Sequence, residues 1–389
     1  ILVQLHDTAT RILDDAGAII TPTLVLSAGS DWVVKNAAQR RFFDRHSSSS
    51  KVMKTYPGFF HAILYEKDRA KPVSAARRFL LDAFEQPVER SELLEADFAS
   101  YTQREYEELR CAPPLWKKLF FGAQRLALRS VGRLSQGIRI GCQTGFDSGT
   151  SLDYIYENEA RGTTVLGRWI DRAYLNAIGW RGIRERGENL KACLTDEIRR
   201  LAKDHQPVRI LDVAAGCGRY VLEVVTANPD IEVRAHLQDN TPRNVEAGRK
   251  LAESMSIGNI EFAEGDAFDK NALLARSPRP HIAIVSGLYE LFPENEPIRR
   301  SLAGIAGALE PGGTLIYTSQ PWHPQLEFIA RTCDNREGRP WIMRRRSQAE
   351  MDELVREAGL AKIATRPDAY GIFSVSVATM PGASRPKAE

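Results

Sequence analysis

The residues from Arg209 to Tyr220 offer the clearest chemistry in this chain. An apolar run ends in Asp212 and passes directly into Gly216 and Gly218. Glycines there let a ligand approach the backbone closely, and the helix expected after them presents free amides and the positive end of its dipole. This pattern is typical of a strand, loop and helix that bind an adenosine-containing ligand.

Two common nucleotide motifs are excluded at this loop. A dinucleotide fingerprint needs a third glycine where the chain has Val221, and the Gly-Lys-Ser/Thr of a phosphate-binding P-loop is absent. Two further acids follow in the chain: Asp239 closes the next apolar run, and Asp266 comes after a third. A carboxylate at the first of these positions can accept hydrogen bonds from both hydroxyls of a ribose.

Four segments in order resemble the motifs of class I S-adenosylmethionine-dependent methyltransferases. They are Asp212–Gly218, Ala235–Pro242, Phe262–Ala267 and Leu309–Tyr317, and the first departs from the family at Ala214, where a glycine is usual. The resemblance implies an α/β, Rossmann-like fold with a seven-stranded sheet and a terminal antiparallel hairpin. It also implies S-adenosyl-L-methionine as cofactor. The residues that it assigns to cofactor binding are Asp212, Ala214, Gly216, Gly218, Asp239, Asn240, Asp266, Ala267 and Ser286.

The acceptor side of such a site is expected from the loops after two later strands, because ligands bind at the carboxyl ends of strands in doubly wound folds. Tyr289 and Glu290 follow one of these strands and His323 follows the other, and each can orient an acceptor or take its proton. The alternative is that Tyr289 only walls the cleft and His323 is structural. Arg344–Arg346 either hold an anionic head group or form a solvated charge run.

A second resemblance covers the beginning of the chain. Pro22–Val34 and Tyr56–Lys67 resemble the last third of an α/β-hydrolase, in which the triad acid follows one late strand and the histidine follows the next. Asp31 and His61 stand at these positions as a triad remnant. No serine has glycines two residues before and two after it, so hydrolase activity is not expected of this chain. The start at Ile1 favours the loss of a preceding segment.

The composition limits the partners. The chain has 53 basic and 50 acidic side chains, so no global field favours nucleic acid. Five scattered cysteines without a C-x-x-C pair argue against a disulfide framework or a zinc site, and we expect no metal and a cytoplasmic location. No apolar run approaches the length of a membrane span. The expected partner is a small-molecule or lipid-like methyl acceptor, and the oligomeric state stays open.

We expect three parts: residues 1–86 as the end of an α/β-hydrolase domain, 87–150 as a helical linker, and 151–389 as a methyltransferase domain with an N-terminal helical cap. A loop is predicted at 140–152, and helices at 153–180 and 187–204. Alternation of strands with helices predicts a parallel, doubly wound sheet, with a closing hairpin. The predicted strands are 20–27 and 51–56 in the first part, and 208–213, 231–237, 259–263, 281–286, 313–319, 361–366 and 371–379 in the last.

The arrangement as a whole resembles bacterial fusions of an α/β-hydrolase with a class I methyltransferase. Such a fusion implies that both activities meet a related substrate, such as a lipid or an acyl ester. Two alternatives remain open. The methyltransferase part is a binding or regulatory module without catalysis, or the protein is a hydrolase that is active only in a longer chain.

Overall fold

The computed structural model describes residues 8–9, 12–13, 16–19, 21–46, 48–85 and 91–381. The chain divides into two compact units, Ile1–Glu105 and Tyr106–Glu389. The domain boundaries expected from the sequence, at residues 86 and 150, stay predictions.

The first unit contains a parallel strand pair joined through a helix. β1 pairs with β2 from Thr23 opposite Lys51 to Ala28 opposite Tyr56, so both strands end at the same edge. β2 coincides with the predicted strand 51–56. The elements in chain order are η1 (Ala16–Ala18), β1 (Thr23–Ala28), α2 (Asn36–Arg45), β2 (Lys51–Tyr56), α3 (Ala70–Glu85), α4 (Ser91–Leu94), α5 (Ala96–Ala99) and α6 (Tyr101–Arg110), the last of which runs into the second unit.

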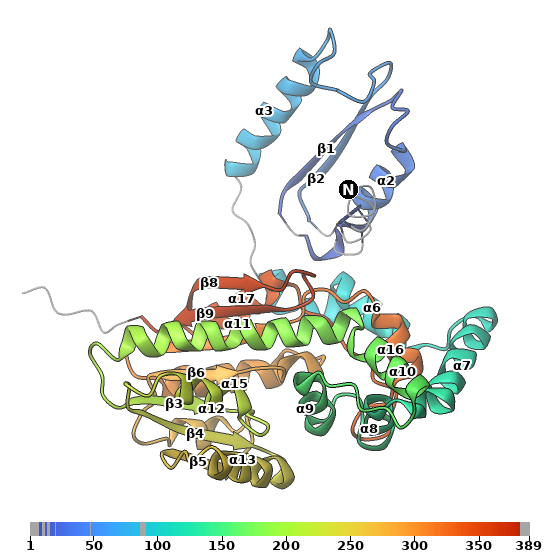
Figure 1. The fold of residues 1–389 in the computed structure, drawn as a ribbon. Coiled ribbons are helices and arrows are strands. Elements are labelled where there is room, and N and C mark those ends of the chain that lie inside the picture. The colour runs from blue at the N-terminus through green and yellow to red at the C-terminus, as the bar shows by residue number, and fades with distance from the viewer. Residues whose placement is uncertain are drawn as a thin grey trace, which may run out of the picture. The chain divides into compact units, whose positions relative to one another are not determined.

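The second unit begins with helices and continues as alternating strands and helices (Figure 1). The helical part comprises α7 (Leu115–Arg129), η2 (Val131–Leu134), α8 (Gln136–Thr144), α9 (Gly149–Glu157), α10 (Val165–Leu175) and α11 (Ile178–Leu201). The alternating part comprises β3 (Val208–Asp212), α12 (Arg219–Ala227), β4 (Val233–Asp239), α13 (Pro242–Ser254), β5 (Ile260–Glu264), α14 (Lys270–Leu274), β6 (Ile282–Val285), η3 (Tyr289–Leu291), α15 (Glu296–Ala308), β7 (Thr314–Ser319), α16 (Leu326–Thr332), α17 (Gln348–Glu357), β8 (Ala361–Pro367) and β9 (Ser374–Thr379).

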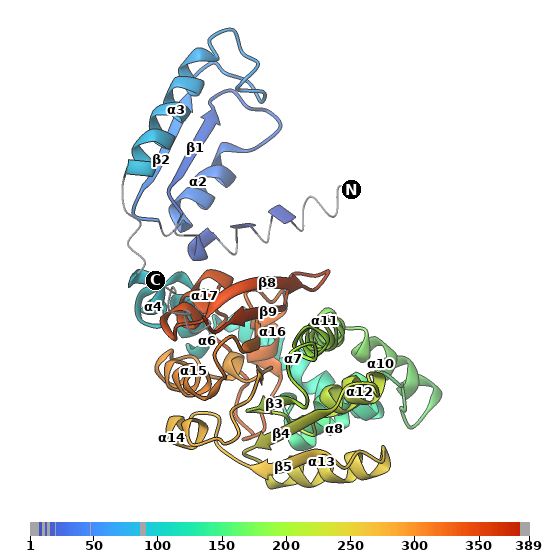
Figure 2. The same cartoon turned by 90° about the vertical axis from the view of Figure 1, so that its left-hand side faces the viewer.

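The seven strands form one sheet in the order β5-β4-β3-β6-β7-β9-β8. The first five run parallel, and β9 pairs antiparallel with both β7 and β8. Figure 2 shows α11, α12 and α13 on one face of this sheet and α14, α15 and α17 on the other. The predicted α/β fold with a doubly wound, seven-stranded sheet and a terminal hairpin is confirmed.

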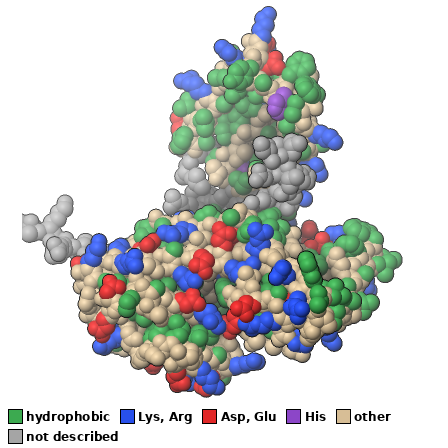
Figure 3. Space-filling view, viewed as in Figure 1, with side chains coloured by type: hydrophobic (Ala, Val, Ile, Leu, Met, Phe, Trp, Pro, Cys, Tyr) green, Lys and Arg blue, Asp and Glu red, His purple; other side chains and the backbone are tan. Residues whose placement is uncertain are grey.

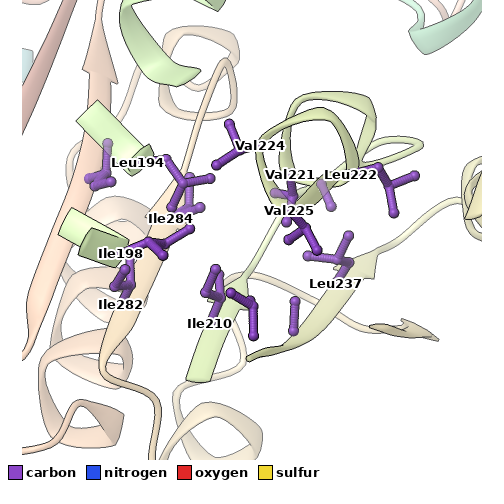
Figure 4. Close-up of a cluster of buried hydrophobic side chains, with 14 of the residues drawn as sticks. Leu194, Ile198, Ile210, Val221, Leu222, Val224, Val225, Leu237, Ile282 and Ile284 are labelled. Carbon is purple, nitrogen blue, oxygen red and sulfur yellow. The ribbon is translucent and has the colours of Figure 1, made fainter. Parts of the chain in front are cut away.

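One core cluster of the second unit lies between the sheet and the helices α11 and α12. Fully buried aliphatic side chains from the central strands meet those of α11 and α12 (Figure 4). Burial of each such side chain stabilises the fold by roughly 1.5–3 kcal/mol. The side chains labelled there include Leu194, Ile198, Ile210, Val221, Leu222, Leu237, Ile282 and Ile284. Val221, which breaks the dinucleotide fingerprint, is therefore a core residue.

Two predictions on the helical part were wrong. Residues 140–152 were expected as a loop, but most of them lie in α8 and α9. Serine caps explain this result, because Ser135 Oγ accepts from Ile138 N and Ser148 Oγ accepts from Ser151 N, so each starts a helix despite the glycines and threonines nearby.

The helix predicted at 153–180 is also broken. α9 ends at Glu157 and is capped by Asn158, whose φ of 53° is left-handed, and Thr164 caps the start of α10. The next helix, α11, starts at Ile178 and so absorbs most of the helix predicted at 187–204. No helix among the described residues is long and apolar enough to cross a membrane.

Candidate functional site

A cavity of about 900 Å³ opens at the carboxyl ends of the parallel strands in the second unit. Its wall includes the loops that follow β3, β4, β5, β6 and β7 and the inner sides of α8, α9, α10 and α11. Ligand pockets typically enclose roughly 300–1,000 Å³, so the cavity is large enough for a ligand of ordinary size. Seven of the nine predicted cofactor residues line it: Ala214, Gly216, Asp239, Asn240, Asp266, Ala267 and Ser286.

Asp212 does not line the cavity, although the sequence placed it in the cofactor site. It is fully buried beneath the loop, where Oδ1 accepts a hydrogen bond from Ala214 N at 3.1 Å and Oδ2 accepts one from the Tyr220 hydroxyl. Burial raises the pKa of this carboxyl from 3.8 to about 7. Asp212 therefore supports the loop from behind and shapes the site indirectly.

The two glycines of the loop have different roles. Both have positive φ, 58° at Gly216 and 70° at Gly218, which favours glycine at each position. A Cβ at Gly218 would lie 2.5 Å from Leu237 Cδ1, so this residue packs against the core and not the cavity. A Cβ at Gly216 would meet nothing within 4 Å, so the backbone there is open to a ligand.

Asp239 connects three segments around the cavity. Its Oδ2 accepts from Gly216 N at 3.0 Å, and its Oδ1 accepts from Thr241 N at 2.9 Å and from Asn244 Nδ2 at 3.0 Å. A carboxylate offers about four acceptor positions, so Oδ2 keeps capacity for one more donor. The position of Asp239 at the cavity, its partial burial and its remaining hydrogen-bond acceptor capacity all suit a carboxylate that holds a ligand hydroxyl.

The loop after β5 supplies another wall of the cavity, beyond Asp239. Asp266 is exposed to the cavity, and its Oδ1 accepts from Phe268 N at 2.9 Å, which leaves the other oxygen available. The rings of Phe268 and Phe292 meet edge to face with centroids 4.6 Å apart, and both line the cavity. On the opposite side, the thiol of Cys217 donates to Asp153 Oδ1 at 3.3 Å. Burial raises the pKa of this thiol to about 11, so Cys217 acts as a small polar wall residue.

Glu290 and Arg186 form a buried charged pair in the same cavity. Glu290 Oε1 accepts from Thr318 Oγ1 at 2.9 Å and lies 4.0 Å from Arg186 Nη1, whereas Glu290 Oε2 has no hydrogen-bond partner in the described part of the chain. The guanidinium lies over the ring of Phe373 at 4.9 Å and against Gly287, where a Cβ would be 3.2 Å from Nη2. The structure thus brings a carboxylate with unused acceptor capacity to the predicted acceptor side.

The other two predicted acceptor residues differ in position. His323 lines the cavity, and its Nδ1 accepts from Gln325 N at 3.1 Å, which places the proton of the neutral ring on Nε2. Burial lowers the pKa of His323 from 6.5 to about 4, so the ring is a hydrogen-bond donor at neutral pH and a poor base. Tyr289 is not among the cavity-lining residues, because its buried hydroxyl donates to Ser301 Oγ at 2.8 Å.

The geometry of Arg344–Arg346 supports neither an anionic head-group site nor a solvated charge run. All three side chains are buried, and Arg344 Nη2 donates to Glu350 Oε1 at 2.8 Å. Arg346 donates to the carbonyls of Tyr289, Phe292 and Glu294 at 2.5–2.9 Å. Arg344 and Arg346 therefore hold the loop after β6, and with it Glu290, in place, whereas Arg345 donates to the carbonyl of Pro321 after β7.

An apolar arm of the cavity was missed by sequence reasoning, as was Arg186. Arg186 shares a face of α11 with Ile183 and Leu190, at the spacing of a buried stripe, and this spacing was the available signal for Arg186. The arm combines side chains of α8, α10, α11 and α16 with Phe146 and Trp341 from connecting loops. The Trp180 and Trp341 rings stack with centroids 6.4 Å apart, and Trp341 Nε1 has no partner among the described residues. The arm is lined by Ile138, Phe146, Ile170, Tyr174, Trp180, Phe328 and Trp341.

The first unit brings its two predicted residues together. Asp31 and His61 follow β1 and β2, and because these strands are parallel their loops meet at one edge. His61 Nδ1 lies 3.1 Å from Asp31 Oδ2, with the Asp31 side chain 3% exposed and the His61 side chain 51% exposed. Amides of Val33 and Val34 also donate to Asp31, and these bonds together with His61 lower the pKa of its carboxyl. An oriented imidazole with an exposed face results.

The comparisons with known proteins agree with both units. A family model described as "Putative methyltransferase" matches residues 76–380, and one described as "Serine aminopeptidase, S33" matches residues 1–68. The chain is 43% identical over 382 residues to the uncharacterised protein YnbC of Escherichia coli strain K12, which covers 97% of this chain and 65% of that relative. The chain thus spans less than two thirds of the length of this relative.

Two further similarities are more distant. A demethylmenaquinone methyltransferase of Deinococcus radiodurans is 29% identical over 118 residues, or 30% of this chain and 45% of that protein. A crystal structure of a possible exported protein from Bordetella parapertussis covers 76% of this chain and 97% of its own, with 16% identity and a TM-score of 0.50, which shows a shared fold. The match over residues 76–380 decides the family: this chain belongs to the methyltransferase family of that model and carries a fragment of a serine hydrolase at its beginning.

Proposed function

We propose that the second unit transfers the methyl group of S-adenosylmethionine to a hydroxyl oxygen of a small, largely apolar acceptor. One observation carries this proposal. A single cavity joins the Gly216 loop, Asp239 and Asp266 at one end to Glu290, His323 and an aromatic arm at the other. A cofactor and an acceptor can therefore meet in one enclosed space.

The cofactor end fits adenosine and methionine groups. The open backbone at Gly216 suits close approach of the ligand, and the remaining acceptor position of Asp239 suits a ribose hydroxyl. Asp266 would accept from the adenine amino group, and the amide of Ala267 would meet a ring nitrogen. Phe268 and Phe292 would enclose the ring.

When bound, the cofactor supplies an activated methyl group and its own leaving group, so the protein contributes orientation, desolvation and proton handling. Glu290 Oε2 is placed to accept the proton of an acceptor hydroxyl, since it is buried and lacks another donor in the described part of the chain. Arg186 places a positive charge beside this carboxylate, with its Nη1 4.0 Å from Glu290 Oε1. The Nε2–H of His323 is available to orient an acceptor oxygen.

The acceptor body is expected to occupy the apolar arm. Stacked and edge-to-face aromatic rings favour a ring system or hydrocarbon chain, while the free indole N–H of Trp341 can bind one oxygen atom. This arrangement favours an uncharged lipid-like molecule over a peptide or a nucleic acid.

The proposal is tested by incubating the protein and a cell extract with methyl-tritiated S-adenosylmethionine, followed by extraction into organic solvent. We expect labelled product with the wild type and a loss of about 10²–10⁴-fold in Glu290→Gln, the usual contribution of a general base. Glu294→Gln, an exposed acid on the same loop, is the matched control. Cofactor binding without transfer to any fraction would instead favour a binding module.

A second candidate function concerns the first unit. The 3.1 Å contact between His61 and Asp31 favours an acid–histidine pair of a serine hydrolase. This chain has no nucleophile in a Gly-x-Ser-x-Gly setting, so a fluorophosphonate probe should leave it unlabelled. Labelling of a longer chain that supplies such a serine, and its loss in His61→Ala, would establish the hydrolase role.

A further inference from the structure

The second unit presents an apolar surface on the outer sides of α7 and α10. We call it the α7–α10 surface and define it by Leu115, Trp116, Leu119, Phe120, Leu166 and Trp169, all of which are more than half exposed. Figure 3 shows hydrophobic side chains gathered where α7 and α10 lie in Figure 1. Monomeric proteins rarely expose a contiguous patch of this kind without an interaction partner.

Exposed apolar side chains also lie between the two groups, with Leu126 near the end of α7, Val131 in η2 and Val165 at the start of α10. η2 contacts both α7 and α10, and a Cβ at Gly167 of α10 would lie 2.4 Å from the carbonyl oxygen of Leu134. On α7, the spacing of Leu115, Trp116, Leu119 and Phe120 places them on one side of the helix. The exposed rings and leucines therefore form one face.

The segment that contains α7 and η2 is rich in basic side chains. Residues 111–146 contain six basic side chains and no acidic one. Asp334 pairs with both Arg125 and Arg129, and Glu327 pairs with Lys117, so two acids from elsewhere offset three of these cations. Basic side chains beside exposed Trp, Phe and Leu are the composition of helices that lie in the surface of an anionic membrane.

The opposite sides of the same helices line the cavity. Leu128 of α7 and Ile170, Ala173 and Tyr174 of α10 belong to its wall. A membrane against the outer face would bring hydrocarbon close to the apolar arm, which suits an acceptor that dissolves in lipid. This consequence rests on the proposed methyl transfer, whereas membrane contact itself does not.

We propose that the α7–α10 surface docks the second unit on an anionic phospholipid bilayer, as an interfacial contact without a membrane span. The apolar side chains enter the headgroup boundary, and the basic side chains face the lipid phosphates. Increasing salt should weaken the interaction because it screens the attraction between the basic side chains and the lipid phosphates.

Flotation with vesicles tests this proposal in the absence of cofactor. We expect the wild type to bind equimolar phosphatidylcholine and phosphatidylglycerol vesicles more tightly than phosphatidylcholine alone. Leu119→Glu should lower the affinity by at least about tenfold, since it removes a leucine side chain that would enter the bilayer and adds a charge that the anionic lipid repels. Ile363→Glu, an exposed apolar residue on the edge strand β8, is the matched control and should bind like the wild type.

Thermal unfolding followed by circular dichroism shows whether both variants stay folded. The proposal is overturned if the wild type fails to bind either vesicle, if it binds both equally, or if Ile363→Glu loses as much affinity as Leu119→Glu. Sedimentation that reveals a dimer dissociated by Leu119→Glu would also overturn it and assign the surface to a second copy of the chain. Because cofactor is absent, failure here is distinct from failure of methyl transfer.

Discussion

Replacing Asp239 by alanine should weaken the binding of S-adenosylhomocysteine, the demethylated cofactor. The structure limits the size of this effect, because Oδ1 already accepts two protein donors and Oδ2 accepts one. One additional hydrogen bond, from a ribose hydroxyl to the charged carboxylate, is therefore expected. A hydrogen bond to a charged group contributes about 1.5–3 kcal/mol, which corresponds to roughly 10- to 150-fold in affinity.

Isothermal titration calorimetry measures this change directly. Asp230→Ala is the matched control, since Asp230 is an exposed acid in the turn before β4 and away from the cavity wall. We expect the control to bind like the wild type. Equal affinity of Asp239→Ala and the wild type would refute the assignment of this carboxylate, and an equal loss in Asp230→Ala would point to a general charge effect.

Three further predictions concern stability and ionisation. Gly218→Ala should lower the free energy of unfolding by about 1–3 kcal/mol, because the added methyl group meets the core and the backbone has a positive φ. Gly216→Ala should mainly weaken cofactor binding. Urea titration measures the first effect and calorimetry the second, and a larger loss of stability in Gly216→Ala with a larger loss of binding in Gly218→Ala would contradict these roles. Asp212 has a folded pKa of about 7 against 3.8 in the unfolded chain, so its neutral form favours folding at low pH and this contribution is lost as the pH rises between these values. The free energy of unfolding of the wild type should thus fall relative to that of Asp212→Asn by up to about 1.4 kcal/mol per pH unit in that window. Equal pH dependence of the two proteins would exclude the raised pKa of Asp212. NMR of the histidine ring nitrogens should show His323 neutral with its proton on Nε2 at pH values near its ordinary pKa of 6.5, and titration at that value would contradict its buried placement.

The strands and their mostly parallel arrangement could be predicted because most of them are short apolar runs that end in polar or glycine-rich residues. The cofactor positions followed from the same logic, since residues after parallel strands must meet at one edge of the sheet. Asp239 and Asp266 are of this kind. Burial of Asp212 and Gly218 behind the loop depends on how the loop packs, which spacing along the chain does not specify.

The acceptor side of the cavity depends on which way individual side chains point, and the local sequence does not determine this. Tyr289 and Glu290 are neighbours in a tight turn, yet only the carboxylate lines the cavity, because the hydroxyl of the tyrosine finds Ser301. Arg346 sets this turn from a loop far along the chain. The aromatic arm likewise arises from tertiary packing of helices and loops that lie far apart along the chain.

A crystal structure with S-adenosylhomocysteine tests the central claim most directly. We predict a ribose hydroxyl within hydrogen-bond distance of Asp239 Oδ2, the adenine beside Asp266, and the cofactor sulfur facing Glu290 across the cavity. A ligand bound elsewhere, or no ligand at saturating concentration, would contradict the proposed cofactor site.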